Sequence, residues 1–404
     1  MTQPRQSRIL IIASIIIMAA NLRPTITGVG PLIGIISRGT GLSSGLAGIV
    51  TTLPLIAFGL LSPFAPRAAR RFGLERTLYA GLIILLGGTL LRSSGTAWSL
   101  MVGMFLVGSG VAIGNVLLPS LVKRDFPTRI GLMTGIYTTV MNIFAGLASG
   151  ISVPLSHIVG LGWRGSLAAW GILTLVALLL WLPHLRQRHM PESSTVGGMW
   201  RSPIAWQVTL FMGLQSFLFY VNVAWLPTLL HDRGMSLTLS GWLVSLMQIV
   251  SLPGTFLMPI LAGRQRRQQN LVIAIALLFF FGYLGLLVTH GSLVSILWVI
   301  FIGFGAGASI SLALAFFSLR THNHHQAGQI SGMAQSVGYL LAALGPLAVG
   351  LLHSAFLSWT VPLIMLLVVV VLMALAGLGA GRNIYIEVDE KAERSPNRSS
   401  GTPH

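Results

Sequence analysis

The chain has 404 residues, of which only 8% are charged, and its 25 Lys and Arg outnumber 8 Asp and Glu to give a net charge of +17. A soluble domain carries about 25% charged residues, so a soluble fold is excluded, and the 54% apolar content excludes a disordered chain. The chain contains no cysteine, which rules out disulfides and thiolate metal sites, and what remains is a polytopic helical membrane protein.

Long apolar runs, broken by charged residues or Gly/Pro clusters, divide the chain into twelve candidate membrane spans. Each is near the length of about 20 residues that a helix needs to cross the hydrocarbon core. We expect spans at 9–36, 45–66, 76–92, 98–122, 131–154, 164–183, 203–230, 237–262, 270–289, 292–318, 327–352 and 357–381. The sequence marks the boundary between the ninth and tenth spans, near Thr289–Ser292, least clearly.

The basic residues set the expected orientation of these spans. With the N-terminus in the cytoplasm, most Lys and Arg fall in cytoplasmic segments, and only Arg38, Arg92, Arg164 and Arg233 fall outside. We therefore expect both termini to be cytoplasmic. The charges alternate between loops and form no single basic face, so the net charge indicates topology and we expect no nucleic-acid partner.

The two halves of the chain contain a repeated segment. The stretch from Gly108 to Gly135 resembles the stretch from Gly305 to Gly332 at a constant offset of 197 residues. One register covers two spans and the loop between them, which predicts two halves related by an axis along the membrane normal. We expect an N-terminal six-helix bundle at 1–183, a cytoplasmic linker at 184–202, a C-terminal six-helix bundle at 203–382 and a disordered cytoplasmic tail at 383–404.

Glycines four residues apart occur in several spans. The pairs are Gly110/Gly114, Gly131/Gly135, Gly146/Gly150, Gly303/Gly307 and Gly328/Gly332. Residues at this spacing lie above one another on a helix face and let neighbouring backbones approach closely. We expect each pair to pack against another helix.

Arg23 is the charged residue that lies deepest in a predicted span. It is midway between Arg8 and Arg38, about 22 Å from either at 1.5 Å per residue. A central arginine costs about 2.5–3.5 kcal/mol on insertion scales, and all 8 acids fall in loops, at helix ends or in the tail. Arg23 must be satisfied by neutral oxygens, by water or by an anionic or electron-rich solute, which leaves a structural and a solute-binding role both open.

The segment around Arg23 reads Asn21-Leu22-Arg23-Pro24-Thr25-Ile26-Thr27-Gly28-Val29-Gly30-Pro31. Its two prolines remove two backbone donors and leave carbonyl groups without partners. A membrane protein tolerates such irregular backbone where it lines a cavity. We expect a broken helix with Asn21 and Thr25 beside Arg23 in a binding site; a simple proline kink is the alternative.

Further polar residues in the middle of the spans provide candidates for a pocket between the halves. They are Asn115, Tyr137, Thr138 and Asn142 in the first half, and Gln215, Tyr220, Gln248, Ser309, Gln335 and Tyr339 in the second. The 197-residue offset pairs Thr138 with Gln335 and Asn142 with Tyr339, as a central site would require. Each residue taken singly is more often explained by a hydrogen bond between helices.

No catalytic or cofactor motif occurs in the sequence. There is no His-Glu-x-x-His and no pair of carboxylates within a span. The tract His322-Asn323-His324-His325 has no acid or cysteine nearby to complete a metal site. We expect a non-enzyme with no catalytic residue, no metal and no cofactor.

Several strings distributed over nearly the whole chain share a family pattern. They are Asn21-Leu22-Arg23-Pro24, Gly28-Val29-Gly30-Pro31, Thr51-Thr52-Leu53-Pro54-Leu55, Ser62-Pro63-Phe64-Ala65-Pro66, Gly114-Asn115-Val116-Leu117-Leu118-Pro119, Val122-Lys123-Arg124-Asp125-Phe126-Pro127, Ser202 to Phe211 and Ser331 to Leu341. Together these strings resemble the cyanate transporter and 2-nitroimidazole transporter branch of the major facilitator superfamily.

This resemblance implies an all-α membrane protein with twelve transmembrane helices in two pseudo-symmetric six-helix bundles, the major facilitator fold. It implies a transporter in a bacterial inner membrane that moves a small polar or anionic solute, cyanate-like or 2-nitroimidazole-like, by alternating access. We expect a monomer; a membrane sensor or scaffold on the same fold is the alternative. The chain departs from the superfamily pattern after the second span, where Pro63–Arg71 keeps three arginines but has no Asp.

Overall fold

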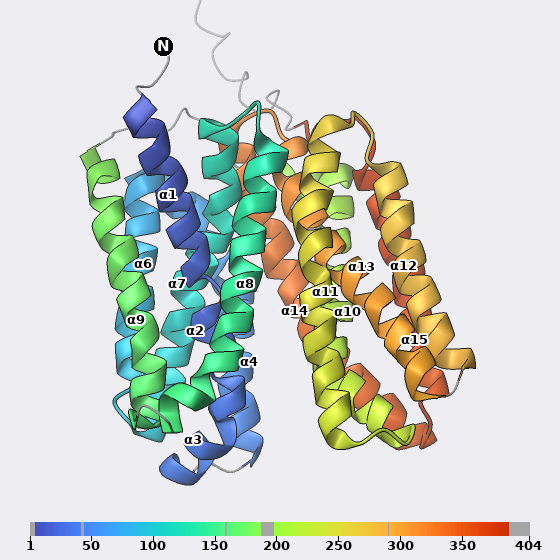
Figure 1. Ribbon diagram of the computed structural model, residues 1–404. Helices are drawn as coiled ribbons and strands as arrows, with labels where there is room; N and C mark the ends of the chain where they lie inside the picture. Colours follow the sequence, from blue (N-terminus) through green and yellow to red (C-terminus); the bar gives the residue numbers. More distant parts are fainter. Residues whose placement is uncertain (1–4, 42–43, 158–159, 187–197, 290, 388–404) are drawn as a thin grey trace, which may run out of the picture.

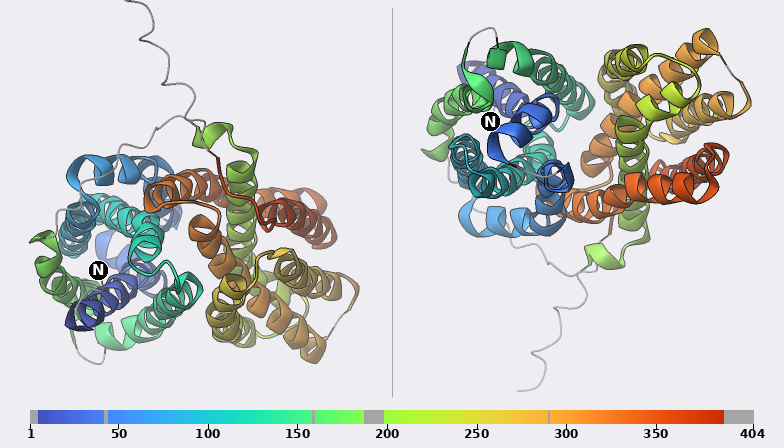
Figure 2. Two further views of the ribbon diagram at one scale, coloured as in Figure 1. Left: turned by 90° about the horizontal axis from the view of Figure 1, so that it is seen from above. Right: turned by 90° about the horizontal axis from the view of Figure 1, so that it is seen from below.

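The computed structural model describes residues 5–41, 44–157, 160–186, 198–289 and 291–387. Within these ranges the regular secondary structure is entirely helical. The helices form two bundles that stand side by side, one built from the first half of the chain and one from the second (Figures 1 and 2). The predicted all-α architecture with two bundles is confirmed.

The first bundle contains nine α-helical segments. They are α1 (Arg5–Asn21), α2 (Pro24–Thr27), α3 (Ile33–Thr40), α4 (Ser44–Leu61), α5 (Phe64–Phe72), α6 (Leu74–Arg92), α7 (Ala97–Asp125), α8 (Ile130–His157) and α9 (Gly162–Trp181), with a 3-10 turn η1 (Gly30–Leu32) before α3. The first expected span is divided among α1, α2, η1 and α3, and the second between α4 and α5.

The second bundle contains six long helices, one for each expected span. They are α10 (Pro203–Asp232), α11 (Leu237–Arg264), α12 (Gln269–Val288), α13 (Ser292–Leu319), α14 (His324–Phe356) and α15 (Thr360–Ala380). The boundary near Thr289–Ser292 lies where the sequence placed it.

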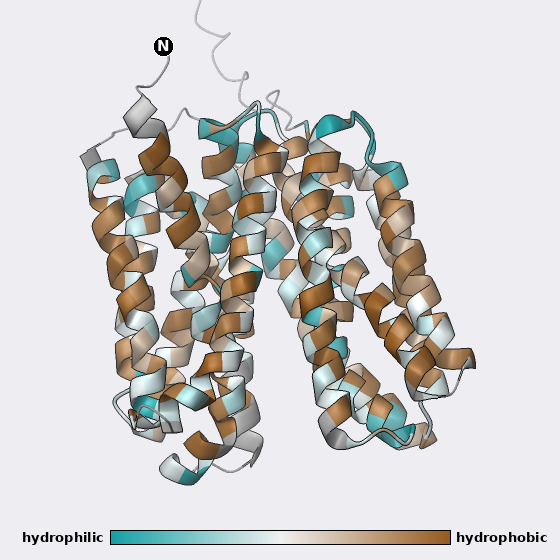
Figure 3. Ribbon diagram, in the orientation of Figure 1, coloured by the Kyte–Doolittle hydropathy of each residue, from teal (hydrophilic) through white to brown (hydrophobic). Residues whose placement is uncertain are grey.

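Eleven helices among the described residues are long and apolar enough to cross a membrane. The expected second span corresponds to α4, an 18-residue helix whose part Thr52–Leu61 is a shorter apolar helix, and to α5. Pro63 interrupts this span and begins the separate helix α5. Figure 3 shows apolar residues along the lengths of the helices and hydrophilic residues concentrated toward their ends.

The expected break in the first span is present. α1 ends at Asn21, and α2 begins at Pro24. In a continuous helix the N–H of Val29 would bind the carbonyl of Thr25, but it donates instead to the carbonyl of Ile26 at 3.3 Å. The carbonyl of Thr25 is thereby released, and it accepts a hydrogen bond from Nη1 of Arg92 on α6.

We call the end of the molecule where α1 begins the basic end, because Arg70, Lys123, Arg124 and Arg320 lie there; it is at the top of Figure 1. The two bundles bind each other directly at this end. Nζ of Lys123 donates to the carbonyls of Ser318 and Thr321 at 2.7 and 2.6 Å, across the interface between α7 and α13. The hydroxyl of Ser318 in turn donates to the carbonyl of Pro119 at 3.1 Å.

Glycines let the bundles approach closely at the basic end. A Cβ added at Gly131 or Gly135 of α8 would collide with the carbonyl of Pro259 or Phe256 on α11. The pairs Gly110/Gly114, Gly303/Gly307 and Gly328/Gly332 also meet neighbouring helices closely, as predicted.

The prediction is wrong for Gly146 and Gly150, which have nothing within 4 Å of an added Cβ. These two glycines lie toward the opposite end of α8, where this helix no longer packs closely on a neighbour through that face. The interface between the bundles is therefore tight at one end of α8 and open at these positions near the other.

The C-terminal segment is ordered for longer than the sequence indicated. Ile386 is fully buried, and its N–H donates to the carbonyl of Arg320 at 2.8 Å. The ring of Tyr385 stacks on His322 with centroids 4.5 Å apart. The expected tail therefore does not begin at residue 383, because Tyr385 and Ile386 contact the basic end. Residues 388–404, and 187–197 of the expected linker, lie outside the described residues.

Candidate functional site

A pocket of about 400 Å³ lies between the two bundles. The first bundle contributes Arg23 and Asn142, and α10, α11, α13 and α14 of the second bundle contribute the rest. The lining residues are Arg23, Asn142, Gln215, Ser216, Phe219, Tyr220, Gln248, Ser251, Ala306, Gly307, Ile310 and Tyr339. The lining therefore combines one permanent cation with amides, hydroxyls and aromatic rings from both halves of the chain.

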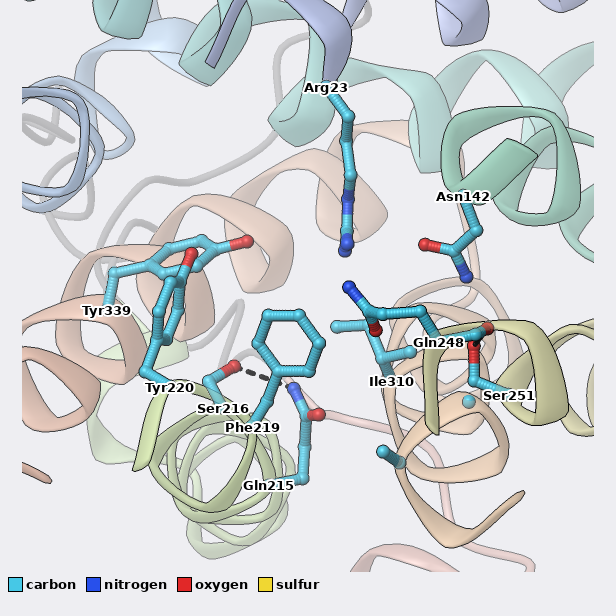
Figure 4. A pocket seen from close by; sticks show the side chains of 12 residues that line it. Arg23, Asn142, Gln215, Ser216, Phe219, Tyr220, Gln248, Ser251, Ile310 and Tyr339 are labelled. Carbon is cyan, nitrogen blue, oxygen red and sulfur yellow. Dashed lines mark hydrogen bonds between the residues drawn. The ribbon is translucent and has the colours of Figure 1, made fainter. Parts of the chain in front are cut away.

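Arg23 reaches the pocket because the first helix is broken at its position. It is the residue directly before α2, and its side chain points from the first bundle toward the second (Figure 4). The guanidinium carbon lies 5.8 Å from the centroid of the Phe219 ring on α10. Among the described residues no side chain hydrogen-bonds this guanidinium, and no carboxylate lies within 4.0 Å of it.

Of the four acids that the structure describes, three lie at helix ends and Glu387 lies in the C-terminal segment, and none lines the pocket. Glu75 and Asp125 both bind Arg124 at the basic end, at 2.5 and 2.8 Å. Asp232 lies at the other end of α10 and accepts a hydrogen bond from the indole of Trp359 at 2.9 Å. The expectation that no acid accompanies Arg23 is consistent with these positions.

Three amide side chains line the pocket together with Arg23, those of Asn142, Gln215 and Gln248. Nδ2 of Asn142 donates to Oγ1 of Thr255 on α11 at 3.0 Å, and this bond joins the two bundles. The carbonyl oxygen of Asn142 turns toward Arg23 (Figure 4). On α10, Nε2 of Gln215 donates to the hydroxyl of Ser216 at 2.7 Å, and this hydrogen bond lies next to the Phe219 ring.

Aromatic rings form the remaining wall of the pocket. Tyr220 and Tyr339 pack edge to face with centroids 6.4 Å apart, and Phe58 of the first bundle packs on Tyr339 at 4.6 Å. The hydroxyl of Tyr339 points toward Arg23 (Figure 4). Phenol hydroxyls donate and accept hydrogen bonds, and ring faces suit a flat solute.

The arrangement suits recognition of a small planar anion. A guanidinium presents its donors as a planar fork that matches two acceptor atoms of one solute. The Tyr339 hydroxyl and the neighbouring amides can bind further polar atoms, and Phe219 with Ile310 supplies an apolar floor. No lining residue is an acid, so a solute anion has no carboxylate to oppose it here.

Six of the thirteen predicted candidates line this pocket: Arg23, Asn142, Gln215, Tyr220, Gln248 and Tyr339. Asn21 and Thr25 do not, because they serve the first bundle. Nδ2 of Asn21 donates to the carbonyl of Leu173 at 3.2 Å, and its Oδ1 accepts from Thr174 at 2.7 Å. The Thr25 hydroxyl donates to the carbonyl of Asn21 at 3.4 Å within its own helix.

The other five predicted residues also lie outside the pocket lining: Asn115, Tyr137, Thr138, Ser309 and Gln335. The hydroxyl of Thr138 donates to the carbonyl of Thr134 at 2.7 Å, and Nε2 of Gln335 donates to Ser331 at 2.9 Å. Of the two repeat-related pairs, Asn142 with Tyr339 lines the pocket and Thr138 with Gln335 does not. The second pair lies one helical turn nearer the basic end, where the bundles are in contact.

Sequence reasoning missed several lining residues. Ser216 and Phe219 lie on α10 between Gln215 and Tyr220, and positions 215, 216, 219 and 220 share one helix face. Helical spacing would therefore have found them from the two that were predicted. Ser251 follows Gln248 by three residues on α11 for the same reason, but the small residues Ala306 and Gly307 give no chemical signal in the sequence.

The hydrogen bonds between the bundles lie beside the pocket or on its basic side. They include Asn142 to Thr255, Lys123 to the end of α13, and the hydroxyl of Ser336 on α14 to the carbonyl of Gly59 on α4. Gly146 and Gly150, beyond the pocket, are open. The structure thus shows a pocket that is sealed toward the basic end.

Comparisons with known proteins agree on one family. Residues 9–346 match the family model of the Major Facilitator Superfamily. The chain is 49% identical over 388 residues to the uncharacterized transporter YycB of Bacillus subtilis, covering 95% of this chain and 96% of that protein. It is 42% identical over 383 residues to the 2-nitroimidazole transporter of Escherichia coli, covering 94% and 97%.

A more distant relative is the cyanate transport protein CynX of Escherichia coli, 28% identical over 346 residues, covering 84% of this chain and 89% of that protein. Among solved structures, the transporter FucP in the outward conformation superposes with a TM-score of 0.76 at 12% identity, covering 92% of this chain and 98% of that chain. The proton:xylose symporter XylE gives a TM-score of 0.74 at 14% identity, covering 95% and 98%. At these identities the structural likeness shows the fold alone.

Proposed function

Because this chain belongs to the Major Facilitator Superfamily and is a membrane transporter of a small solute, we propose that it carries a small planar anion by alternating access and that Arg23 recognises the negative charge. The observation that carries this proposal is an unpaired guanidinium in a pocket that both bundles line. Breaking the first helix to hold a cation there is costly, and a bound anion offsets that cost.

The chemical class of the solute follows from the lining. A guanidinium, a phenol hydroxyl and amides favour acceptor atoms, and the Phe219 ring favours a flat shape. Cyanate is a small linear anion, and 2-nitroimidazole is a flat heterocycle that can lose its ring proton. These two solutes occur in the names of relatives that are 28% and 42% identical to this chain, and we propose them as the first solutes to test.

The orientation of the sealed end decides the direction from which the solute enters. We propose that the basic end faces the cytoplasm of a bacterial inner membrane, because cytoplasmic segments of membrane proteins are rich in Lys and Arg. The structure would then represent the outward-facing state of a monomeric carrier with both termini inside. The glycine-mediated contact between α8 and α11 would close the cytoplasmic side in this state.

The lining also bears on energy coupling. Proton-coupled carriers commonly use acidic side chains as relays within the membrane, and no lining residue of this pocket is an acid. We propose that the protein works as a uniporter or exchanger, with any proton movement carried by the solute itself. Uptake that followed an imposed pH gradient for a solute without an exchangeable proton would contradict this coupling.

Counterflow in proteoliposomes tests the proposed function. Vesicles loaded with unlabelled cyanate or 2-nitroimidazole should accumulate the same labelled solute transiently, and vesicles without protein should not. Arg23→Gln protein that melts at the same temperature as wild type is the matched control and should give no overshoot. Absence of counterflow for both solutes, with folded wild-type protein in the vesicles, would contradict the proposed solute class.

A further inference from the structure

A second cavity lies at the basic end, between α5 and α7 of the first bundle and α14 of the second. It encloses about 440 Å³, and its polar lining consists of Arg70, Ser120, Arg124, His324, His325 and Gln329. Apart from these six residues the lining is glycine and apolar side chains. The cavity is separate from the solute pocket, with which it shares no lining residue.

Three hydrogen-bonding groups in this lining are buried without a partner. They are Nη1 of Arg70, Oγ of Ser120 and Nε2 of Gln329. Ser120 as a whole is only 3% exposed, and a Cβ added at Gly328 would lie 2.6 Å from its hydroxyl oxygen, so this oxygen borders the cavity. A buried donor without an acceptor costs about 1–3 kcal/mol, and three such donors around one cavity indicate a missing acceptor.

The surroundings favour an acceptor with negative charge. Among the described residues the lining contains no carboxylate, and the neighbouring acids Glu75 and Asp125 are both bound to Arg124. The Arg70 guanidinium has no such partner: burial, and after it the proximity of Arg67, lower its pKa below the ordinary value. A nearby anion would act in the opposite direction and stabilise the charged form.

The N-terminus of α14 faces the same cavity. His324, His325, Gly328 and Gln329 belong to the first turns of this 33-residue helix. Asn323 caps the N–H of Gln326 in the first turn, and the dipole at the helix N-terminus favours a bound anion nearby. A guanidinium, a hydroxyl, an amide and a helix N-terminus around one cavity are donors of the kind that bind phosphate-like oxyanions.

We propose that this cavity is an accessory oxyanion site, which binds a phosphate group between Arg70, Ser120, Gln329 and the N-terminus of α14. Its donors come from both bundles. The site therefore exists only while the basic end is sealed, and separation of α5 and α7 from α14 would dismantle it. A ligand that binds one state only shifts the equilibrium toward that state, so the anion stabilises the sealed basic end.

Thermal unfolding of the full chain in detergent, titrated with inorganic phosphate, tests this site. The melting temperature should rise by about 2 °C at a tenfold excess over the dissociation constant and should continue to rise with the logarithm of the phosphate concentration. Sodium chloride at the same ionic strength should give no such rise. Arg70→Gln should lose the phosphate response, whereas Arg71→Gln should keep it, because Arg71 is exposed on the same helix and lies outside the cavity lining.

Ser120→Ala distinguishes a binding role from a structural one. Because the Ser120 hydroxyl has no partner in the protein, its removal should leave the melting temperature without phosphate unchanged or higher. The phosphate response should nevertheless fall, with a dissociation constant raised about 5-fold for one lost hydrogen bond. A response equal to wild type in both Ser120→Ala and Arg70→Gln would overturn the proposal.

A lipid headgroup could supply the same phosphate chemistry, and lipid nanodiscs separate the two sources. If the headgroup is the ligand, phosphatidylglycerol should stabilise wild type relative to Arg70→Gln more than phosphatidylcholine does, and added phosphate should have no further effect. If free phosphate is the ligand, its effect should persist in both lipids. No Arg70-dependent effect in any of these conditions would overturn the proposal, whether or not the protein transports cyanate or 2-nitroimidazole.

The natural absence of cysteine allows a direct measure of occupancy. Ala69→Cys places one thiol in the cavity wall, and phosphate should slow its alkylation saturably, with the same dissociation constant as in the melting experiment. Alkylation at an unchanged rate with saturating phosphate would contradict binding at this site.

Discussion

The interface between the bundles and the interior of the first bundle each hold an arginine, and the two arginines have different surroundings. Arg92 is fully buried, and its guanidinium donates to the carbonyls of Thr25 and Leu167. Arg23 is half-buried, and no described side chain hydrogen-bonds its guanidinium. The first arginine binds carbonyls of its own bundle through both terminal nitrogens, whereas the second faces a pocket.

This difference shows how one broken helix serves two purposes. At the end of α2 the N–H of Val29 donates to Ile26 and leaves the Thr25 carbonyl free, and Arg92 binds this carbonyl and ties the first expected span to α6. The break between α1 and α2 turns Arg23 toward the second bundle, where the neutral groups of α10 and α14 leave its charge uncompensated. We therefore expect stability and transport to depend on different arginines that lie close in the fold, and substitutions can separate them.

The largest expected effect is that of Arg23→Gln on transport. Removing one partner of a charge pair in a desolvated site costs at least about 2–3 kcal/mol, which corresponds to about 100-fold or more. We expect counterflow to fall by at least that factor, while the melting temperature stays within about 1 °C because the lost side chain has no hydrogen bond in the protein. Loss of folding in place of transport would show that Arg23 is structural.

Arg92→Met should give the converse result. Two buried carbonyl groups, of Thr25 and Leu167, would lose their donor, at about 1–3 kcal/mol for each unsatisfied group. We expect a large fall in melting temperature and, for protein that remains folded, transport near the wild-type rate. Counterflow per folded molecule, measured with the fraction folded from gel filtration, checks this; a folded but inactive variant would remove the contrast between the arginines.

A matched pair of glycine substitutions in α8 compares the two ends of the bundle interface. Ala is favoured over Gly within a helix by about 1 kcal/mol. Gly146→Ala, which meets nothing within 4 Å, should therefore stabilise the protein slightly. Gly135→Ala, which would meet the carbonyl of Phe256, should destabilise it by about 1 kcal/mol.

Melting temperatures of the two glycine variants measure this difference. Equal shifts in both would contradict the tight contact at the basic end. The pair also separates helix propensity from packing, since both positions lie within the same helix.

The smallest expected effect is that of Phe219→Leu. The Arg23 guanidinium lies over this ring at 5.8 Å, and such contacts contribute about 0.5–1 kcal/mol at partly exposed sites. Leucine keeps the apolar floor and removes the ring face, so we expect solute affinity to change about 2- to 5-fold. A loss comparable to that of Arg23→Gln would indicate that Phe219 binds the solute directly as a stacking surface.

The sequence predicted the helices more completely than the pocket. Long apolar runs fix helix positions, because the bilayer requires a fixed length of apolar chain; the second span deviates because Pro63 interrupts it. The importance of Arg23 was also predictable, because an arginine near the middle of a span without an acid beside it must be satisfied by other polar groups or by a solute. The ordering of Ile384 to Ile386 was not foreseen, because the composition of the tail as a whole concealed a short apolar segment.

Which polar side chains meet in the pocket depends on tertiary contacts that the sequence does not display. Asn21 is as polar and as central as Asn142, yet it binds α9 inside its own bundle. Thr138 is one helical turn from Asn142 but bonds its own backbone. Periodicity places such residues on a helix and gives their spacing, but the orientation of that helix toward its neighbours decides which of them reach the pocket.

We expect Arg23 to recognise the charge of the solute. Binding measurements in which the Arg23 charge and the solute charge are each removed test this expectation. Titration calorimetry would compare cyanate with neutral cyanamide, and 2-nitroimidazole with 1-methyl-2-nitroimidazole, in wild type and in Arg23→Gln. The account predicts that wild type prefers the ionisable member of at least one pair by about 30-fold or more and that Arg23→Gln abolishes this preference. An equal preference in both proteins would contradict it.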